Sequence, residues 1–266
     1  MKKENIGTVL LFALGVIAAV VLFYIDPISQ NEAYHTFSDR RSFMNIPNCW
    51  NVISNYPFVI VGGLGVIYFT RNNKLQMSYL LLFLGVILVA IGSGYYHLFP
   101  SSHSLIWDRL PMTIVFMTLF SIIVREFISV KLGRLMLLPL ILIGLSSVLY
   151  WVYGESGDLR LYGLVQFYPM VAIPIILIFF TSKYTSGLEY WMLLAFYIAA
   201  KILEHFDSEV YEFLGFISGH SLKHILAAMG LYVLLHFYKK RSDELEVKNF
   251  KASSGSYSLP KQFLPK

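Results

Sequence analysis

Three histidines, one serine and one aspartate stand at spacings that could assemble a metal centre. Ser93 and His97 are four residues apart, and so are His220 and His224, which puts both members of each pair on one helix face. Asp108 begins the hydrophobic stretch that follows the short polar segment around Ser93 and His97, which we interpret as a loop. Such a histidine pair can hold one metal ion, and a third histidine completes the ligand set of a catalytic zinc site.

These residue types suit hydrolysis. A bound zinc ion lowers the pKa of its water and polarises a carbonyl group. Asp108 could accept a proton from that water and return it to a leaving group. Ser93, one turn from His97, could donate a hydrogen bond to a developing oxyanion. The expected zinc ligands are therefore His97, His220 and His224, and the expected catalytic residues are Ser93 and Asp108.

Each of these features also has a structural interpretation. A single His-x3-His pair is common in helices, and Ser93 lies between Gly92 and Gly94, as small residues do where transmembrane helices touch. Asp108 could simply pair with Arg109. The residues alone leave both interpretations open. The case for a metal site is stronger for the set than for any one residue, because the hydropathy pattern puts all five residues at the same end of three hydrophobic stretches, where ionisable groups are costly.

The composition predicts a membrane protein. The chain has 266 residues, of which 56% are hydrophobic and only 14% charged, whereas a soluble domain carries about 25% charged residues. The formal net charge is +5, but the basic residues lie beside hydrophobic stretches as they do in cytoplasmic loops, so we expect no nucleic-acid partner. Cys49 is the only cysteine, which excludes an intrachain disulfide and a thiolate metal cluster.

Eight hydrophobic stretches each approach the ~20 residues that a bilayer requires. The first follows Lys2 and Lys3 and is predicted to be a retained helix, because Ile25-Asp26-Pro27 offers no small-residue cleavage site for a signal peptidase. The predicted fold is all-α, a polytopic membrane helical bundle of seven core transmembrane helices plus one N-terminal helix. The stretches run roughly over Thr8–Tyr24, Val52–Thr70, Ser78–Leu98, Leu105–Glu126, Leu132–Tyr153, Tyr162–Thr181, Leu188–Phe206 and Ser218–Tyr238.

The distribution of Lys and Arg predicts the orientation. With the N-terminus inside, one side of the membrane holds most of the basic loop residues, in agreement with the positive-inside rule. His97, Asp108 and His220 then lie at the outer surface, and the C-terminus is cytoplasmic. The inner residues are Arg71, Lys74, Arg125, Lys131, Arg134, Lys183, Lys239, Lys240 and Arg241, and the outer ones are Arg40, Arg41, Arg109 and Arg160.

The chain divides into four predicted segments. Residues 1–30 form the N-terminal transmembrane helix and the start of an outer loop, and residues 31–50 form an outer polar segment. Residues 51–240 form the seven-helix core, and residues 241–266 form a polar cytoplasmic tail that we expect to be disordered. Within the core, Lys201 shares a helix face with Glu204 or His205, which predicts a buried structural ion pair.

The set Ser93-x3-His97, Asp108 and His220-x3-His224 resembles the CREST superfamily, which joins alkaline ceramidases, adiponectin-type receptors and related membrane hydrolases. Within it, residues 50–55 (Trp-Asn-Val-Ile-Ser-Asn) resemble the Trp-Asn-Thr-Ile-Ser-Asn stretch of the alkaline ceramidases. Residues 108–112 (Asp-Arg-Leu-Pro-Met) are similar to their Asp-Glu-Leu-Pro-Met stretch. The resemblance implies seven core helices starting at Asn51 and one zinc ion held by the three histidines.

The resemblance also implies a function. It suggests a zinc-dependent intramembrane amidase that hydrolyses an N-acyl sphingolipid such as ceramide to a sphingoid base and a fatty acid, with a membrane lipid as its partner. Two alternatives from the same superfamily stay open, namely an adiponectin-receptor-like membrane receptor and a lipid-remodelling esterase. The receptors have the opposite membrane orientation as a family, so the charge distribution favours the ceramidase.

Two departures from the ceramidase pattern have consequences. Alkaline ceramidases carry an acidic segment before the first core helix that binds calcium, whereas the stretch from Asp39 to Asn51 has one carboxylate. Because calcium favours several carboxylate oxygens, we expect weak or no calcium dependence. Arg109 replaces the acidic neighbour of the family's aspartate, which could alter the preference for a lipid headgroup.

Overall fold

A computed structural model describes residues 2–71, 77–154, 157–182 and 184–253, with side chains up to Arg241. Within these residues the secondary structure is α-helical apart from one short 3-10 turn and an isolated bridge between Phe43 and Ile46. This confirms the predicted all-α class. The elements are α1 (Lys3–Tyr24), η1 (Glu32–His35), α2 (Cys49–Ile53), α3 (Tyr56–Arg71), α4 (Met77–Leu98), α5 (Ser102–Phe127), α6 (Val130–Tyr153), α7 (Arg160–Phe179), α8 (Leu188–His205), α9 (Asp207–Leu214) and α10 (Gly219–Ser253).

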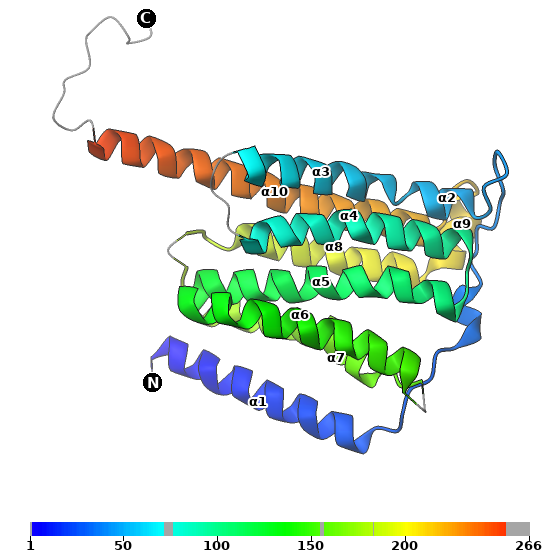
Figure 1. Ribbon diagram of the computed structural model, residues 1–266, viewed down its shortest axis with the longest axis horizontal. Helices are drawn as coiled ribbons and strands as arrows, with labels where there is room; N and C mark the ends of the chain where they lie inside the picture. Colours follow the sequence, from blue (N-terminus) through cyan, green and yellow to red (C-terminus); the bar gives the residue numbers. More distant parts are fainter. Residues whose placement is uncertain (1, 72–76, 155–156, 183, 254–266) are drawn as a thin grey trace, which may run out of the picture.

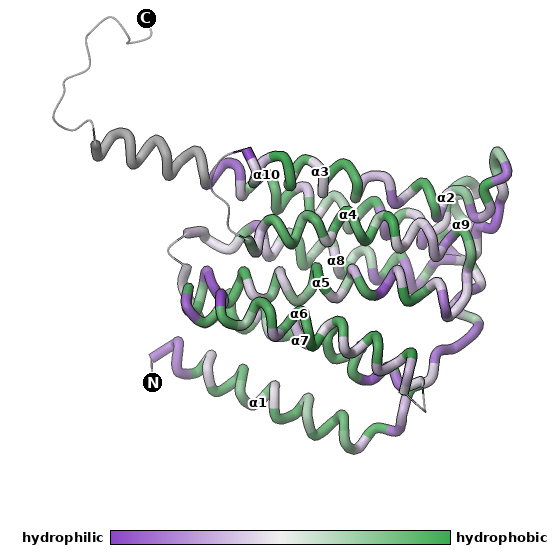
Figure 2. The backbone as a smooth tube through the Cα atoms, viewed as in Figure 1, coloured by the Kyte–Doolittle hydropathy of each residue, from purple (hydrophilic) through white to green (hydrophobic). Residues whose placement is uncertain are grey.

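The long helices run nearly parallel or antiparallel to one another in a single bundle (Figure 1). In the described part of the chain, seven of the segments are long and apolar enough to cross a membrane. Their middles are hydrophobic and their ends polar (Figure 2), as expected when a bilayer surrounds the bundle. The chain is therefore a multi-pass membrane protein. The remaining long helix, α8, carries three charged residues, Glu189, Lys201 and Glu204, and lies within the bundle beside α10.

One sequence-based interpretation of the elements is wrong. The segment around Ser93 and His97 is the last turn of α4 and not a loop, because its serine and histidine face protein and not lipid. The stretch predicted over Val52–Thr70 is confirmed as one candidate membrane span, Cys49–Arg71, within which a turn at Ser54 and Asn55 separates α2 from α3. Helix α10 continues to Ser253, and the disorder expected for the tail stays a prediction.

The continuation of α10 has a simple physical basis. Residues 242–253 contain neither glycine nor proline, and extending a helix that tertiary packing has already nucleated adds one hydrogen bond for each residue fixed. Residues 254–266 lie outside the described residues, and so do Lys74 and Lys183, two of the basic residues used to predict the orientation.

The helices pack in chain order until α10 returns to the start of the core. Helix α4 lies between α3 and α5, α5 packs on α6 and α7, and α10 packs on both α8 and α3. Helix α1 contacts α7 at the edge of the bundle and has only one buried residue, Gly7. Because α10 touches α3 and starts near the end of α4, His97 and His220 can meet although they are 123 positions apart in sequence.

A polar network fixes the end of the bundle at which α1 begins (Figure 1). Each carboxylate oxygen of Glu126 on α5 accepts a hydrogen bond from Arg241 of α10, both at 2.9 Å. The hydroxyl groups of Tyr79 and Tyr190 also donate to Glu126, and Tyr190 lies 3.0 Å from the hydroxyl of Tyr238. This network joins α4, α5, α8 and α10, far from the three histidines.

Candidate metal centre

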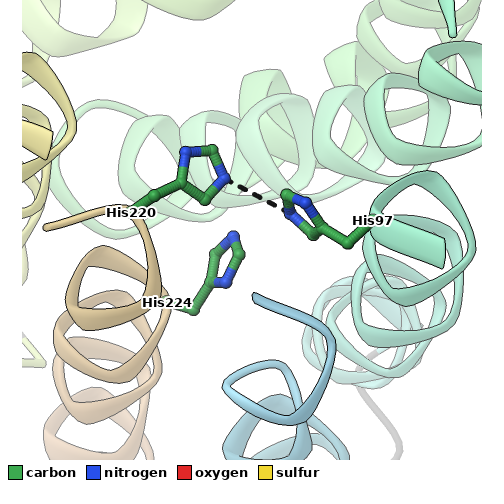
Figure 3. Close-up of side chains that lie close together, drawn as sticks. All are labelled: His97, His220 and His224. Carbon is green, nitrogen blue, oxygen red and sulfur yellow. Dashed lines mark hydrogen bonds between the residues drawn. The ribbon is translucent and has the colours of Figure 1, made fainter. Parts of the chain in front are cut away.

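His97, His220 and His224 converge at the opposite end of the bundle. His97 comes from the last turn of α4, and the other two come from the first turns of α10 (Figure 3). Each offers a ring nitrogen within 4.8 Å of the other two. All three are buried, with exposures of 1%, 7% and 7%. Among the described residues these three form the group of potential ligands that could hold a metal ion.

The separation of the ring nitrogens fits a tetrahedral ion. The Nε2 atoms of His97 and His220 are 3.3 Å apart. Zinc–nitrogen bonds of about 2.0–2.1 Å in a tetrahedron place two nitrogens about 3.3 Å apart. Three imidazoles without a neighbouring thiolate are also a donor set that zinc accepts in catalytic sites. The residues present therefore fit a zinc ion, although the geometry does not fix the identity of the metal.

Hydrogen bonds orient the histidines. The hydroxyl of Ser54, at the turn between α2 and α3, lies 2.8 Å from Nδ1 of His224 and leaves Nε2 free to bind an ion. The side-chain amide of Asn48 donates to the backbone carbonyl of His97 at 2.9 Å. A partner on the second ring nitrogen sets the orientation and the tautomer of a metal-binding histidine, so this role belongs to Ser54. Asn48 holds the backbone at His97, whose Nδ1 is buried and has no hydrogen-bond partner among the described residues. Phe37 covers the site, with its ring 4.7 Å from that of His97 and 5.1 Å from that of His220.

The start of α10 is fixed by α8 and α9. The carboxylate of Asp207 accepts a hydrogen bond from the backbone N–H of His220 at 2.6 Å, one of the donors that a helix leaves unpaired at its N-terminus. Its other oxygen accepts from the N–H of Ser38 at 3.2 Å. A side chain at Gly219 would overlap the carbonyl oxygen of Leu203. The absence of a side chain at Gly219 therefore allows α10 to begin directly against α8.

A close approach of α4 and α5 brings Ser93 beside Asp108. A Cβ atom at Gly92 would overlap the carbonyl oxygen of Trp107. Pro111 has no N–H to donate to that same carbonyl four residues earlier, so the oxygen is left free of its usual helical partner. Gly92 and Pro111 together let the two helices touch here, and Ser93 and Asp108 both line one cavity.

A cavity connects these groups to the interior of the bundle. Its outer part is lined by Ser93, Asp108 and His224. An apolar cavity shares Phe58 and Val89 with it, along with Met112, Tyr197 and Ala227, and continues inward as far as Ile123, Tyr190 and Leu231. The structure thus gathers the three histidines in one cluster and places Ser93, Asp108 and His224 on the outer cavity, which shares lining residues with the apolar one.

Two lysines that share one carboxylate also line the outer cavity. Glu204 pairs with Lys201, as the sequence predicts, and the second oxygen of Glu204 accepts from Lys223 at 2.5 Å. Lys223, Ser54 and Asp207 are not predicted from the sequence, because each acts on a residue in another helix. The His-x3-His spacing does place Lys223 one residue before His224, which is the one signal that could have found it.

Comparison with protein families agrees with the constellation. A model of the family described as Ceramidase matches residues 42–265. The chain belongs to the ceramidase family. The family match covers α2 to α10 and leaves α1 outside it. Membership in the ceramidase family supports a ceramide-hydrolysing function and implies a hydrolase that acts on amide bonds. A search of curated proteins found no match.

Proposed function

We propose that the protein is a zinc-dependent intramembrane amidase that hydrolyses an N-acyl sphingolipid, such as ceramide, to a sphingoid base and a fatty acid. The observation that carries this proposal is a cluster of three histidines of which one, His224, lines the same cavity as Ser93 and Asp108, next to an apolar channel. Ceramidase-family membership supports the same chemistry.

His97, His220 and His224 would hold the ion. The ion would supply Lewis acidity, which lowers the pKa of a water and polarises the amide carbonyl. Asp108 would accept the proton of the attacking water as its oxygen bonds to the carbonyl carbon. Ser93 would donate a hydrogen bond to the carbonyl oxygen as negative charge develops on it. When the carbon–nitrogen bond breaks, Asp108 would return the proton to the amine, leaving a carboxylic acid and a free sphingoid base.

The apolar channel would hold the acyl chain. It lies between α4, α5, α7, α8 and α10 and is lined almost entirely by hydrophobic side chains such as Val86, Leu119 and Leu231. An acyl chain in this channel would place its amide at the outer cavity, beside Ser93 and Asp108. Fixing the amide next to the proton acceptor is the positioning contribution that a binding channel makes to catalysis.

The test is product analysis by lipid mass spectrometry on the purified full-length protein, with and without a chelator. We expect N-acylsphingosine to yield sphingosine and fatty acid, the chelator to stop the reaction, and zinc to restore it. A matched ester of the same two chains tests the esterase alternative. Faster cleavage of the ester than of the amide, or full activity after the metal is removed, would contradict the proposal.

Five variants test the roles of the residues. Replacing any of the three histidines by Ala should remove the metal and lower thermal stability together, because metal binding contributes to folding. Asp108→Asn should keep the metal and lose roughly 10²–10⁴ in rate, and Ser93→Ala should keep the metal and lose on the order of 10²–10³ in kcat. His103→Ala is the matched control, because His103 is an exposed histidine in the first turn of α5. This variant should change neither the metal content nor the turnover. Wild-type turnover in Asp108→Asn would falsify its assignment.

A further inference from the structure

Arg109 is a buried cation that lacks a carboxylate partner within the described part of the chain. It is 6% exposed and lies one residue after Asp108, and it lines the same cavity. One guanidinium nitrogen, Nη2, donates to the side chain of Gln30 at 2.7 Å, whereas Nη1 is buried and has no hydrogen-bond partner among the described residues. Burying a charge without a partner is costly, so this arrangement needs an explanation.

An aromatic cage holds the guanidinium group in place. Its central carbon lies 4.4 Å from the ring centre of Trp151 and 4.8 Å from that of Tyr162, with Tyr34 at 5.8 Å. Such contacts favour a cation but do not neutralise it, and they satisfy none of its N–H donors. The cage therefore fixes the position of a positive charge and leaves a donor available for an acceptor that the described residues do not provide.

The two lysines add to the positive character of the cavity. Lys201 and Lys223 share the single carboxylate of Glu204, so two cations are balanced by one anion. The side chain of Lys201 is 39% exposed, while that of Lys223 is 16% exposed. Three cationic side chains and two carboxylates, those of Asp108 and Glu204, thus line one cavity. A divalent ion at the histidines would add to this excess of positive charge.

We propose that the outer cavity recognises an anionic headgroup, such as a phosphate, on the lipid, with Arg109 as its anchor and Lys201 as a second contact. This inference rests on the proposed function, because it places the headgroup beside the amide that Asp108 and Ser93 would process. A neutral headgroup would leave the Arg109 charge without a partner. An anion would receive charge-assisted hydrogen bonds, and the planar guanidinium suits a phosphate oxygen pair.

The proposed headgroup preference is tested by equilibrium lipid binding to the metal-free full-length protein in neutral detergent. This measurement depends neither on turnover nor on the charge of a metal ion. The three probes are N-palmitoylsphingosine, its 1-phosphate and palmitate. A hydrogen bond to a charged group contributes about 1.5–3 kcal/mol, and 1.4 kcal/mol corresponds to a tenfold change. We therefore expect the phosphate lipid to bind about tenfold or more tightly than the neutral lipid, and more tightly than palmitate.

Variants assign the preference to the cavity. Arg109→Gln should remove most of the advantage of the phosphate lipid, and Arg109→Lys should keep the charge but lose part of the advantage. Lys201→Gln should lower the affinity advantage of the phosphate lipid a few-fold, while Glu204 stays paired with Lys223. Arg40→Gln, which removes an exposed positive charge from the same end of the bundle, should leave it unchanged. If Arg109→Gln fails to fold, the Arg109→Lys and Lys201→Gln variants still decide the matter.

Several outcomes would overturn the inference. The first is equal binding of the phosphate and neutral lipids, and the second is binding of palmitate as tight as that of the phosphate lipid. The third is a full preference for the phosphate lipid in folded Arg109 and Lys201 variants, which would leave Arg109 as a structural anchor for Gln30. Hydrolysis of neutral ceramide without a headgroup preference would refute this inference alone. Anion-selective binding without hydrolysis of any lipid would refute the amidase and leave the headgroup site standing.

Discussion

At the scale of single residues, the histidines depend on partners that lie outside the constellation itself. The Ser54 hydroxyl lies 2.8 Å from Nδ1 of His224 and is buried, with 7% exposure. An imidazole whose second nitrogen is held in this way keeps one tautomer and one orientation. Ser54 therefore prepares His224 to bind a metal without touching the ion, and this effect can be separated from the chemistry.

We predict that Ser54→Ala weakens zinc binding by about 10–100-fold, the usual effect of removing such a partner, while the protein stays folded. Zinc affinity is measured by competition with a chelator of known strength. Ser147→Ala is the matched control, because the Ser147 hydroxyl is equally buried but donates only to the carbonyl of Gly144 in its own helix. Equal zinc affinities in the two variants would contradict the role given to Ser54.

The carboxylate of Asp39 is paired with an arginine side chain, which makes it unsuited to a calcium site. It is 1% exposed, and its two oxygens accept hydrogen bonds from Arg41 at 2.9 and 2.7 Å. The Arg41 guanidinium in turn donates to the backbone carbonyl of Phe216, ahead of α10. A carboxylate already paired with a guanidinium is a poor ligand for calcium, which favours several carboxylate oxygens. Asp39 thus ties the outer segment to the start of the last helix.

We accordingly predict weak or no calcium dependence. At a buffered free zinc concentration, activity in EGTA should match activity in added calcium to within about twofold. A calcium ion that stabilised the active protein by 1.4 kcal/mol would instead change the activity about tenfold. Product release is followed at both conditions in the same preparation. The idea is wrong if EGTA abolishes turnover and calcium alone restores it.

At the scale of helices, the meeting of α4 and α5 decides where the chemistry takes place. Ser93 and Asp108 can be neighbours only because Gly92 allows the Trp107 carbonyl to come close. Gly94, two residues away, has no atom within 4 Å of the position that its Cβ would occupy. One glycine is therefore required by packing, and the other is a helix position with room for a side chain.

Gly92→Ala and Gly94→Ala form a matched pair. Gly92→Ala should force the helices apart, because the added methyl would overlap the backbone, and both stability and activity should fall. Gly94→Ala should leave activity intact and raise stability by roughly 0.5–1 kcal/mol, since alanine favours a helix more than glycine does. Unfolding in a denaturing-detergent titration and turnover are measured for both. Equal behaviour of the two variants would show that the α4–α5 contact does not position the site.

The polar network around Glu126 holds the same helices together at the other end. Glu126 is buried, with a side-chain exposure of 2%, and it pairs with Arg241. Removing one partner of a buried pair leaves an uncompensated charge and costs about 3–5 kcal/mol. Glu126→Gln should therefore lower the free energy of unfolding by about this amount while zinc occupancy stays unchanged, because the histidines lie at the far end of the bundle.

The double variant Glu126→Gln/Arg241→Gln checks the explanation. If the penalty comes from the stranded guanidinium, the double variant should be more stable than the sum of the two single losses predicts. Glu4→Gln, which changes an exposed carboxylate on α1, should be close to neutral. Strict additivity of the two single effects would rule out a direct pair as the source of the stability.

At the scale of the whole molecule, the sequence predicts what depends on the bilayer and misses what depends on packing. Hydropathy locates the helices because each backbone polar group in lipid must be satisfied within its own segment. The His220–His224 spacing ensures that both rings share a face. By contrast, Ser54, Asp207 and Lys223 act across helix boundaries, and no spacing in the chain relates them to the residues that they contact.

The misread segment around Ser93 shows the same limit. Glycine, serine and histidine are typical of a turn, but inside a bundle they are also the residues that let helices approach and fill polar cavities. Only the contact of Gly92 with Trp107 distinguishes the two possibilities. Arg109 is similar, because its sequence neighbour suggested an ion pair with Asp108, whereas its observed contacts are three aromatic rings and Gln30.

The orientation in the membrane is predicted from the charges, and the fold makes it directly testable. Helix α10 carries His220 and His224 in its first turns and runs from there toward the other end of the bundle (Figure 1), so we expect the histidines and the last residues of α10 to face opposite sides of the membrane. Cys49 is the single cysteine and is buried, with 2% exposure. The natural chain is therefore a background that should not react with a membrane-impermeant maleimide, and one added cysteine reports one position.

Phe216→Cys places a thiol in the segment before α10, at the histidine end of the bundle. Tyr184→Cys places a thiol in the segment between α7 and α8, at the other end. The natural side chains at both positions are well exposed. The excess of Lys and Arg at the second end predicts that it is cytoplasmic. Intact cells should therefore label Phe216→Cys, and only permeabilised cells should label Tyr184→Cys, with the unchanged chain unlabelled in both. The reverse pattern would place the metal centre on the cytoplasmic side, the orientation of adiponectin-type receptors.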